Sequence, residues 1–158
     1  MTSKAETVME MMAGKGLRLS LAESCTGGLI GAELTSVGGS SSYFMGSAVT
    51  YSNESKQKIL KVSRRSLTKF GAVSDTVAIE MAKGSLKIYA SDVAGSVTGI
   101  AGPDGGTPEK PVGTVWMAVT DGRRTIAYEN HFSGTRDEIR QQTRDVLLEH
   151  IIEFVGTM

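Results

Sequence analysis

The residues best able to perform chemistry are a serine and a lysine, each placed after a predicted strand. Ser24 follows the alternating run 17–22 and precedes two adjacent glycines, and Lys56 lies about one turn into the helix predicted after a second strand, 45–51. A lysine whose pKa falls below its ordinary value of about 10.4, through burial or a neighbouring cation, can accept a serine proton. Ser24 is therefore a candidate nucleophile and Lys56 its candidate general base.

Each of these residues also has an ordinary structural explanation. Ser, Thr and Gly favour turns and helix N-caps, so Ser24 can simply cap the helix that begins near Leu29. Most lysines are exposed, so Lys56 can be a surface residue. Tyr51, at the end of the second strand, is a candidate for orienting a ring or donating a hydrogen bond, or equally an edge aromatic.

Two glycine-rich turns offer backbone groups to a ligand. Thr26-Gly27-Gly28 leads into a helical pattern, and free N–H groups there suit either an oxyanion or a substrate phosphate; both remain open. The second turn, 99–106, lets the backbone approach a ligand closely at Gly99, Ala101 and Gly102. It lacks the Lys-Ser/Thr ending of a Walker loop and the Rossmann spacing, which excludes these ATP and dinucleotide fingerprints.

Two arginines at the start of the last predicted helix are candidate anion ligands. Arg136 and Arg140 are four residues apart, so they share one helix face and can hold a phosphate or carboxylate in bidentate fashion. A solvated helix face explains the pair equally well, and the sequence does not decide which arginine reaches a ligand.

Three other reactive side chains are weaker candidates. Cys25 could act as a nucleophile, but a small apolar cysteine beside Ser24 is more typical of a buried neighbour. His131 lies in a predicted strand and His150 deep in the last helix, and neither has a partner at a useful spacing. Surface or packing roles are expected for both.

Composition excludes several classes of protein. The net charge is zero and no basic stripe appears, which argues against a nucleic-acid partner. One cysteine and two histidines show no zinc-ligand spacing, and no cofactor or metal is expected. No apolar run approaches the ~20 residues that span a bilayer. The absence of a secretory signal and of an internal disulfide indicates a cytoplasmic protein without a membrane partner.

The elements that must position these residues follow from hydrophobic periodicity. The pattern predicts one domain over 1–158, with strands alternating with helices and then a hairpin and a closing helix. We therefore expect an α/β fold, a three-layer α/β/α sandwich around a mixed, mostly parallel sheet. Predicted helices cover 3–14, 29–37, 53–60, 62–70, 75–89 and 135–154, and predicted strands 17–22, 45–51, 93–100, 111–119 and 124–132.

Four segments in this order resemble the C-terminal domain family of the competence/damage-inducible protein CinA. They are Ala22-Glu23-Ser24-Cys25-Thr26-Gly27-Gly28, Val49-Thr50-Tyr51-Ser52-Asn53-Glu54-Ser55-Lys56, Gly71-Ala72-Val73-Ser74, and Thr98 to Gly106 followed by Lys110-Pro111-Val112-Gly113-Thr114-Val115. The resemblance covers nearly the whole chain. It is similar to the stand-alone form of the family, the nicotinamide mononucleotide (NMN) deamidases.

The resemblance implies a metal-independent amidohydrolase that converts NMN and water to nicotinate mononucleotide and ammonia, in a homo-oligomer. It also implies roles for individual residues. Ser24 would be the nucleophile and Lys56 the general base. The substrate would be bound by Tyr51, Thr26, Gly27, Gly28, Gly99, Ala101, Gly102 and Arg140. Ser55 stands where the family motif has alanine, a small change that should not disturb Lys56. The alternatives are a catalytically inactive ligand-binding or scaffold protein and a sugar-phosphate or nucleotide-phosphate hydrolase.

Overall fold

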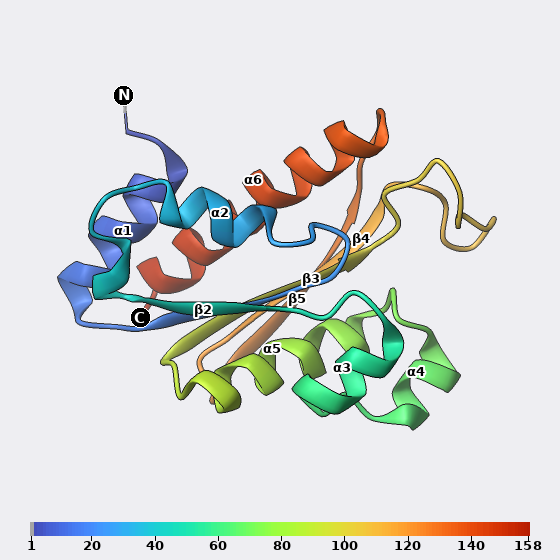
Figure 1. Cartoon of the computed structure of the whole chain (residues 1–158), viewed down its shortest axis with the longest axis horizontal. Helices are drawn as coiled ribbons and strands as arrows, with labels where there is room; N and C mark the ends of the chain where they lie inside the picture. The colour runs from blue at the N-terminus through green and yellow to red at the C-terminus, as the bar shows by residue number, and fades with distance from the viewer. Residues whose placement is uncertain (1) are drawn as a thin grey trace.

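Five strands form one sheet in the computed structural model, which describes residues 2–158. They are β1 (Leu19–Glu23), β2 (Phe44–Val49), β3 (Val93–Gly99), β4 (Thr114–Thr120) and β5 (Thr125–His131). Helices α1 (Lys4–Lys15), α2 (Leu29–Thr35) and α6 (Arg136–Gly156) cover one face, and α3 (Asn53–Leu60), α4 (Arg64–Phe70) and α5 (Asp75–Tyr89) cover the other (Figure 1). A short 3₁₀ turn, Ser40–Ser42, precedes β2. The predicted three-layer fold is confirmed.

The order of the strands brings three carboxyl ends together. The sheet runs β2-β1-β3-β4-β5, with β1 parallel to both β2 and β3, and β4 antiparallel to both of its neighbours. From β1 the chain passes through α2 to β2 on one side, and then through α3, α4 and α5 to β3 on the other side. This reversal leaves a crevice at the end of β1, the place where open α/β sheets bind ligands.

Capping residues explain where the main helices begin. Ser3 with Glu6 and Thr135 with Glu138 form capping boxes at α1 and α6, in which side chain and backbone exchange hydrogen bonds. The predicted boundaries agree to within a few residues. The largest difference is at β4, which begins at Thr114 instead of residue 111. Pro111 lacks an N–H, and Gly113, at φ +96°, is packed against the backbone of Phe132, so regular pairing starts only after it.

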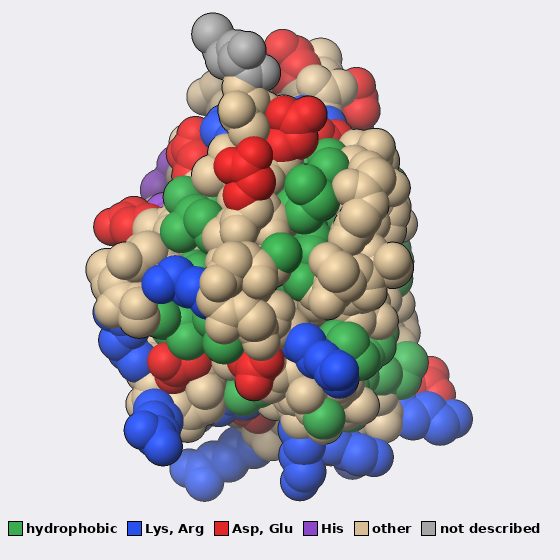
Figure 2. Space-filling model, turned by 90° about the vertical axis from the view of Figure 1, so that its left-hand side faces the viewer, with side chains coloured by type: hydrophobic (Ala, Val, Ile, Leu, Met, Phe, Trp, Pro, Cys, Tyr) green, Lys and Arg blue, Asp and Glu red, His purple; other side chains and the backbone are tan. Residues whose placement is uncertain are grey.

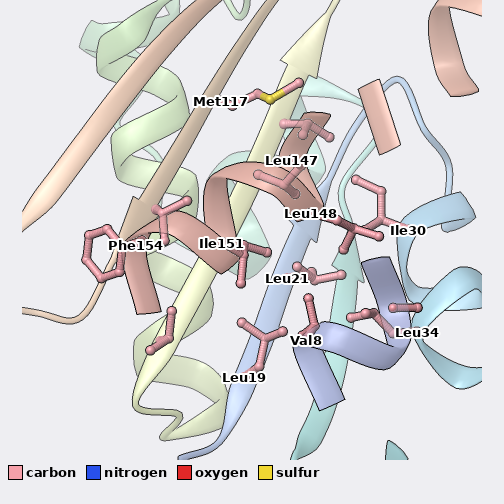
Figure 3. Close-up of a cluster of buried hydrophobic side chains, with 14 of the residues drawn as sticks. Val8, Leu19, Leu21, Ile30, Leu34, Met117, Leu147, Leu148, Ile151 and Phe154 are labelled. Carbon is pink, nitrogen blue, oxygen red and sulfur yellow. The ribbon is translucent and has the colours of Figure 1, made fainter. Parts of the chain in front are cut away.

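The larger hydrophobic core lies between the sheet and the layer of α1, α2 and α6. In Figure 3, Leu147, Leu148 and Ile151 of α6 lie in one cluster with Leu19 and Leu21 of β1. All five side chains are buried. Burial of each such side chain contributes roughly 1.5–3 kcal/mol, so this core holds α6 on the sheet, where it lies over β3 and β4.

Small residues let α5 lie close to the opposite face of the sheet. Ala78 and Ala82 of α5 pack against Ala118 of β4, and all three are fully buried. Gly84 permits an equally close approach of α3, because a Cβ there would lie 2.2 Å from the carbonyl oxygen of Leu60. The end of α3 is thus held directly against α5.

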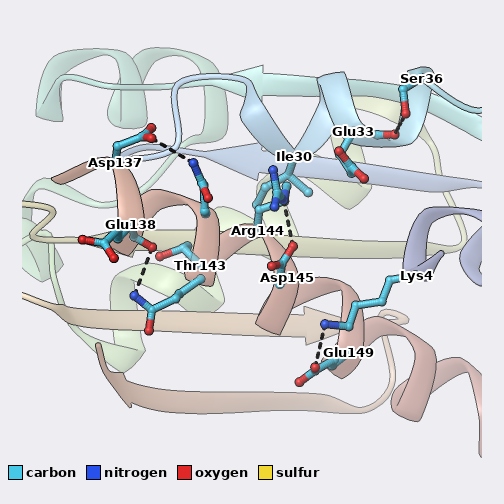
Figure 4. Close-up of polar contacts among 12 residues, drawn as sticks. Lys4, Ile30, Glu33, Ser36, Asp137, Glu138, Thr143, Arg144, Asp145 and Glu149 are labelled. Carbon is cyan, nitrogen blue, oxygen red and sulfur yellow. Dashed lines mark hydrogen bonds and ion pairs between the residues drawn. The ribbon is translucent and has the colours of Figure 1, made fainter. Parts of the chain in front are cut away.

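The two helical layers carry opposite charge although the net charge of the chain is zero. Residues 53–89 contain eight Lys and Arg against three Asp and Glu, whereas α1, α2 and α6 together contain five against eight. In Figure 2, Lys and Arg side chains gather along the bottom, where the first of these layers lies. Figure 4 shows pairs on the other layer, including Lys4 with Glu149 at 2.9 Å and Arg144 with Asp145 at 2.8 Å.

Among the helices of residues 2–158, none combines the length and the apolar character needed to cross a membrane.

Candidate functional site

Ser24 and Lys56 meet at the carboxyl end of β1. Lys56 Nζ lies 2.9 Å from Ser24 Oγ, 2.9 Å from the carbonyl oxygen of Thr50 and 3.1 Å from that of Tyr51. A neutral amine has two N–H groups and one lone pair. Because the two carbonyls accept both N–H groups, the lone pair of a neutral Lys56 is left for the Ser24 hydroxyl, which is the geometry of a general base and its nucleophile.

Burial adjusts the lysine for this task. Lys56 is 1 % exposed and forms no ion pair with a carboxylate in the described part of the chain. Burial therefore disfavours the charged form and lowers the pKa of Lys56 from 10.5 to about 8. A substantial fraction of the amine is then neutral at mildly alkaline pH.

Local structure places the lysine at this point. Ser52 caps α3 by accepting a hydrogen bond from the backbone N–H of Ser55, so the helix starts immediately after β2. Lys56 is one turn further on, on the buried side of α3, and its side chain runs back toward the end of the strand. The backbone N–H of Thr50 donates to the backbone carbonyl oxygen of Glu23 at 2.8 Å, which holds β2 against β1 as far as Ser24 and Lys56.

A cavity of about 290 Å³ opens in front of the pair. Its wall includes the buried residues Ser24 and Cys25 from the turn after β1. It also includes the exposed residues Tyr51 and Asn53, from the end of the β2–α3 connection and the first position of α3. The three polar segments that follow β1, β2 and β3 in the sequence all contribute to this one cavity, so their predicted convergence is found in the structure.

The rest of the wall comes from two loops and α6. The loop after β3 supplies Gly99, Ala101 and Gly102, as expected, and also Asp104 and Gly105. Ala72 and Val73 line the cavity as well, because Thr98 Oγ1 donates to the carbonyl oxygen of Ala72 at 3.0 Å. Sequence reasoning did not name Asn53, Ala72 or Val73 as site residues. The only available signal was their position within the family segments.

Arg136 is the arginine at the mouth of the cavity. Its guanidinium donates to the carbonyl oxygen of Gly102 at 2.6 Å and to the hydroxyl of Tyr51 at 3.3 Å. These contacts join the loop after β3 to the end of β2. A guanidinium has five N–H donors, so this arginine retains donors for an anion.

Four residues predicted to bind substrate lie outside the cavity wall. The hydroxyl of Thr26 donates to the buried carboxylate of Glu23 at 2.7 Å, and Gly27 and Gly28 take positive φ angles where the turn enters α2. Arg140 donates to the carbonyl oxygens of Cys25 and Thr26, at 3.1 and 2.9 Å. These residues therefore shape the turn that carries Ser24, and of the two arginines it is Arg136 that reaches the cavity.

The remaining candidates have structural surroundings. Burial raises the pKa of the Cys25 thiol to about 11, so the thiol is neutral near pH 7. His150 is stacked on Tyr128 at 3.6 Å between ring centroids, and burial lowers its pKa. His131 is an exposed residue of β5. Within residues 2–158 no cluster of three or more His, Cys, Asp or Glu is arranged to hold a metal ion.

Comparison with known proteins gives a consistent result. The family model described as "CinA C-terminal domain" matches residues 1–155. A CinA-like protein of Endomicrobium trichonymphae is 54% identical over 131 residues, which cover 83% of this chain and 31% of that protein. A putative competence-damage inducible protein of Clostridioides difficile is 47% identical over 149 residues, 94% of this chain and 36% of that protein. The chain spans about a third of the length of these curated relatives.

Two solved structures match nearly the whole chain. The competence/damage inducible protein CihA from Agrobacterium tumefaciens has a TM-score of 0.93 and 41% identity, covering 95% of this chain and 92% of that one. A CinA superfamily protein from Klebsiella pneumoniae has a TM-score of 0.93 and 29% identity, and the match covers 99% of this chain and 100% of that one.

Proposed function

The chain belongs to the family of CinA C-terminal domains, and from this premise and the contact between Ser24 and Lys56 we propose that it hydrolyses the carboxamide of NMN. The products are nicotinate mononucleotide and ammonia. The observation that carries the proposal is the 2.9 Å contact of a buried lysine amine with a serine hydroxyl, at an amine that also contacts two carbonyl oxygens able to accept both N–H groups of its neutral form. It is an arrangement suited to acyl transfer.

The reaction proceeds in two stages. Lys56 takes the proton of Ser24 as Oγ attacks the carboxamide carbon, and a tetrahedral oxyanion forms. The C–N bond then breaks, Lys56 returns the proton to the departing ammonia, and an acyl ester remains on Ser24. Water, deprotonated by the same amine, attacks the ester and releases the carboxylic acid. One water is consumed for each ammonia released.

The two anionic groups of the reaction are assigned to different ends of the cavity. Ser24 and Cys25 are buried residues of the wall, so we assign the oxyanion to backbone N–H groups of their turn, each worth roughly 3 kcal/mol if well aimed. Arg136 stands at the mouth with unused donors, and we assign the phosphate of NMN to it. The cationic pyridinium between them would further disfavour a charged Lys56.

The direct test is incubation of the purified protein with NMN, with and without a chelator, while ammonia and inorganic phosphate are both measured. We expect ammonia without phosphate and no effect of the chelator. Release of phosphate instead would indicate a phosphate hydrolase, and release of neither product would indicate a ligand-binding or scaffold protein.

The activity should rise with pH. Lys56 works as a base only when neutral, and with a pKa of about 8 its neutral fraction increases as the pH rises through that value. We expect kcat/KM to rise about tenfold per pH unit below the midpoint and to level off above it. The measurement is kcat/KM from pH 6 to 10. A profile that is flat or falls across this range would contradict a lysine base.

Replacement of Arg136 should weaken substrate binding more than it slows the chemistry. Loss of a charge-assisted contact of about 1.5–3 kcal/mol predicts a KM raised about 10- to 100-fold in Arg136→Gln, with kcat changed only a few-fold. The measurement is steady-state kinetics with NMN. Arg144→Gln is the matched control, because Arg144 lies on the same helix and pairs with Asp145. Equal KM values in Arg136→Gln and Arg144→Gln would show that Arg136 does not bind the substrate.

A further inference from the structure

The carboxylate of Glu23, next to the nucleophile, is completely buried and fully hydrogen-bonded. One oxygen accepts from the Thr26 hydroxyl at 2.7 Å and the Ile30 N–H at 3.0 Å, and the other from the Ser47 hydroxyl at 2.7 Å and the Gly31 N–H at 3.0 Å. Its partners belong to the nucleophile turn, to α2 and to β2. A single side chain thus ties together three segments around Ser24.

Arg140 holds the same turn from α6. Its Nε and Nη2 atoms donate to the consecutive carbonyl oxygens of Cys25 and Thr26. The C=O and N–H of a trans peptide point in opposite directions. By directing the Cys25 carbonyl toward itself, Arg140 therefore directs the N–H of Thr26 away from α6.

The turn has little to fix its shape without these two residues. Its own backbone hydrogen bonds are Gly27 N–H to Ser24 and Leu29 N–H to Thr26, at 3.1 and 3.0 Å. Gly27 and Gly28 have positive φ angles, and glycine leaves the backbone free to take other conformations. The Glu23 carboxylate accepts hydrogen bonds from the turn and from the α2 and β2 residues beside it. Arg140 donates hydrogen bonds to two carbonyl oxygens of the turn.

We infer that Glu23 and Arg140 are positioning residues that hold the Ser24 turn from two sides, so that Ser24 Oγ stays in contact with Lys56 and the peptide groups that follow keep one orientation. The inference rests on the proposed role of Ser24 as nucleophile. It gives Arg140 a different task from Arg136, although the two share one helix face. Arg140 should affect the rate of the chemical step, whereas Arg136 should affect substrate binding.

The test uses Arg140→Gln, Arg140→Lys and Glu23→Gln, with Arg144→Gln as the control. A nucleophile misplaced by about 1 Å can lose about 10²-fold in rate. We expect kcat for ammonia release from NMN to fall about 10- to 100-fold in Arg140→Gln and Glu23→Gln, with KM within about threefold of wild type. Arg140→Lys, which keeps the charge but replaces the Nε and Nη2 donors by one ammonium group, should recover part of the loss. Arg144→Gln should behave as wild type.

A second measurement separates positioning from general structural damage. The rate at which Ser24 reacts with a fluorophosphonate, followed by intact mass well below the melting temperature of each variant, should fall in parallel with kcat. The pH midpoint set by Lys56 should stay near its wild-type value.

Some outcomes would overturn the inference. If Arg140→Gln folds and keeps the wild-type kcat and labelling rate, the inference is wrong. It is also wrong if KM rises in this variant while kcat stays constant, because Arg140 would then be a substrate ligand. If Glu23→Gln does not fold, the result for Arg140→Gln decides the test. Failure of the proposed function can be distinguished from failure of this inference. In the first case wild type releases no ammonia, but the rates of Ser24 labelling in wild type and variants can still be compared.

Discussion

Replacing Ser24 by alanine is expected to abolish ammonia release from NMN, with kcat lower by on the order of 10⁴- to 10⁶-fold. Without the hydroxyl no acyl ester can form, and the remaining wall of the cavity cannot replace a covalent step. The fold should survive, because Lys56 keeps its hydrogen bonds to Thr50 and Tyr51. Kinetics with NMN and a thermal melt of the same preparation would check both parts of the expectation.

The adjacent Cys25 provides the control for this variant. A thiol with a pKa of about 11 is neutral near pH 7 and is a poor nucleophile there. Cys25→Ala should therefore retain ammonia release to within about tenfold, since it keeps Ser24, Lys56 and the backbone of the turn. Loss of activity in Cys25→Ala together with its retention in Ser24→Ala would transfer the role of nucleophile to the cysteine.

Replacing Lys56 by methionine is the second variant expected to have a very large effect. Methionine fills a similar volume but cannot accept a proton, so kcat should fall by on the order of 10³- to 10⁵-fold, through loss of both the activated serine and the protonated leaving group. The measurement is ammonia release at pH 9, where the wild-type rate is expected to approach its plateau. Activity within tenfold of wild type would rule out Lys56 as the base.

The same variant should change how stability depends on pH. The pKa of Lys56 is about 8 in the folded protein and 10.5 as the unperturbed value, so between these values the unfolded state binds the extra proton. The free energy of unfolding of wild type should therefore rise relative to Lys56→Met by roughly 3 kcal/mol between pH 8 and 10.5. Chemical denaturation of both proteins across this range measures the difference. A constant difference would show that burial does not perturb the lysine.

Much of the fold could be predicted because local signals agreed with one another. The capping residues Ser52 and Thr135 mark the starts of α3 and α6, and alternating apolar residues mark the strands. Three polar segments that each follow a strand must converge when those strands are parallel neighbours. Ser24 and Lys56 could therefore be paired from the sequence, although they are separated by a helix and a strand.

The assignment of the two arginines depended on information that local patterns do not contain. Arg136 and Arg140 share a face of α6, and one helical turn of about 5.4 Å separates them along the axis. Which one reaches the cavity depends on the position of α6 along the sheet. This position is fixed by the packing of α6 on β3 and β4, with Leu147 and Ile151 beside Gly95 of β3. Ala72 and Val73 were missed for a related reason, since small apolar side chains give no chemical signal.

The distribution of the cavity wall along the chain has a consequence for how this protein can evolve. Glu23, Ser24 and Lys56 all lie on one uninterrupted segment that runs from β1 to α3, whereas Arg136 and the loop after β3 come from later in the chain. The proposed proton-transfer pair and the surface that would select the substrate are thus encoded separately. Mutation of Arg136 or of the loop after β3 can therefore alter substrate range and leave the reacting pair intact, provided that Arg140 is kept to hold the Ser24 turn.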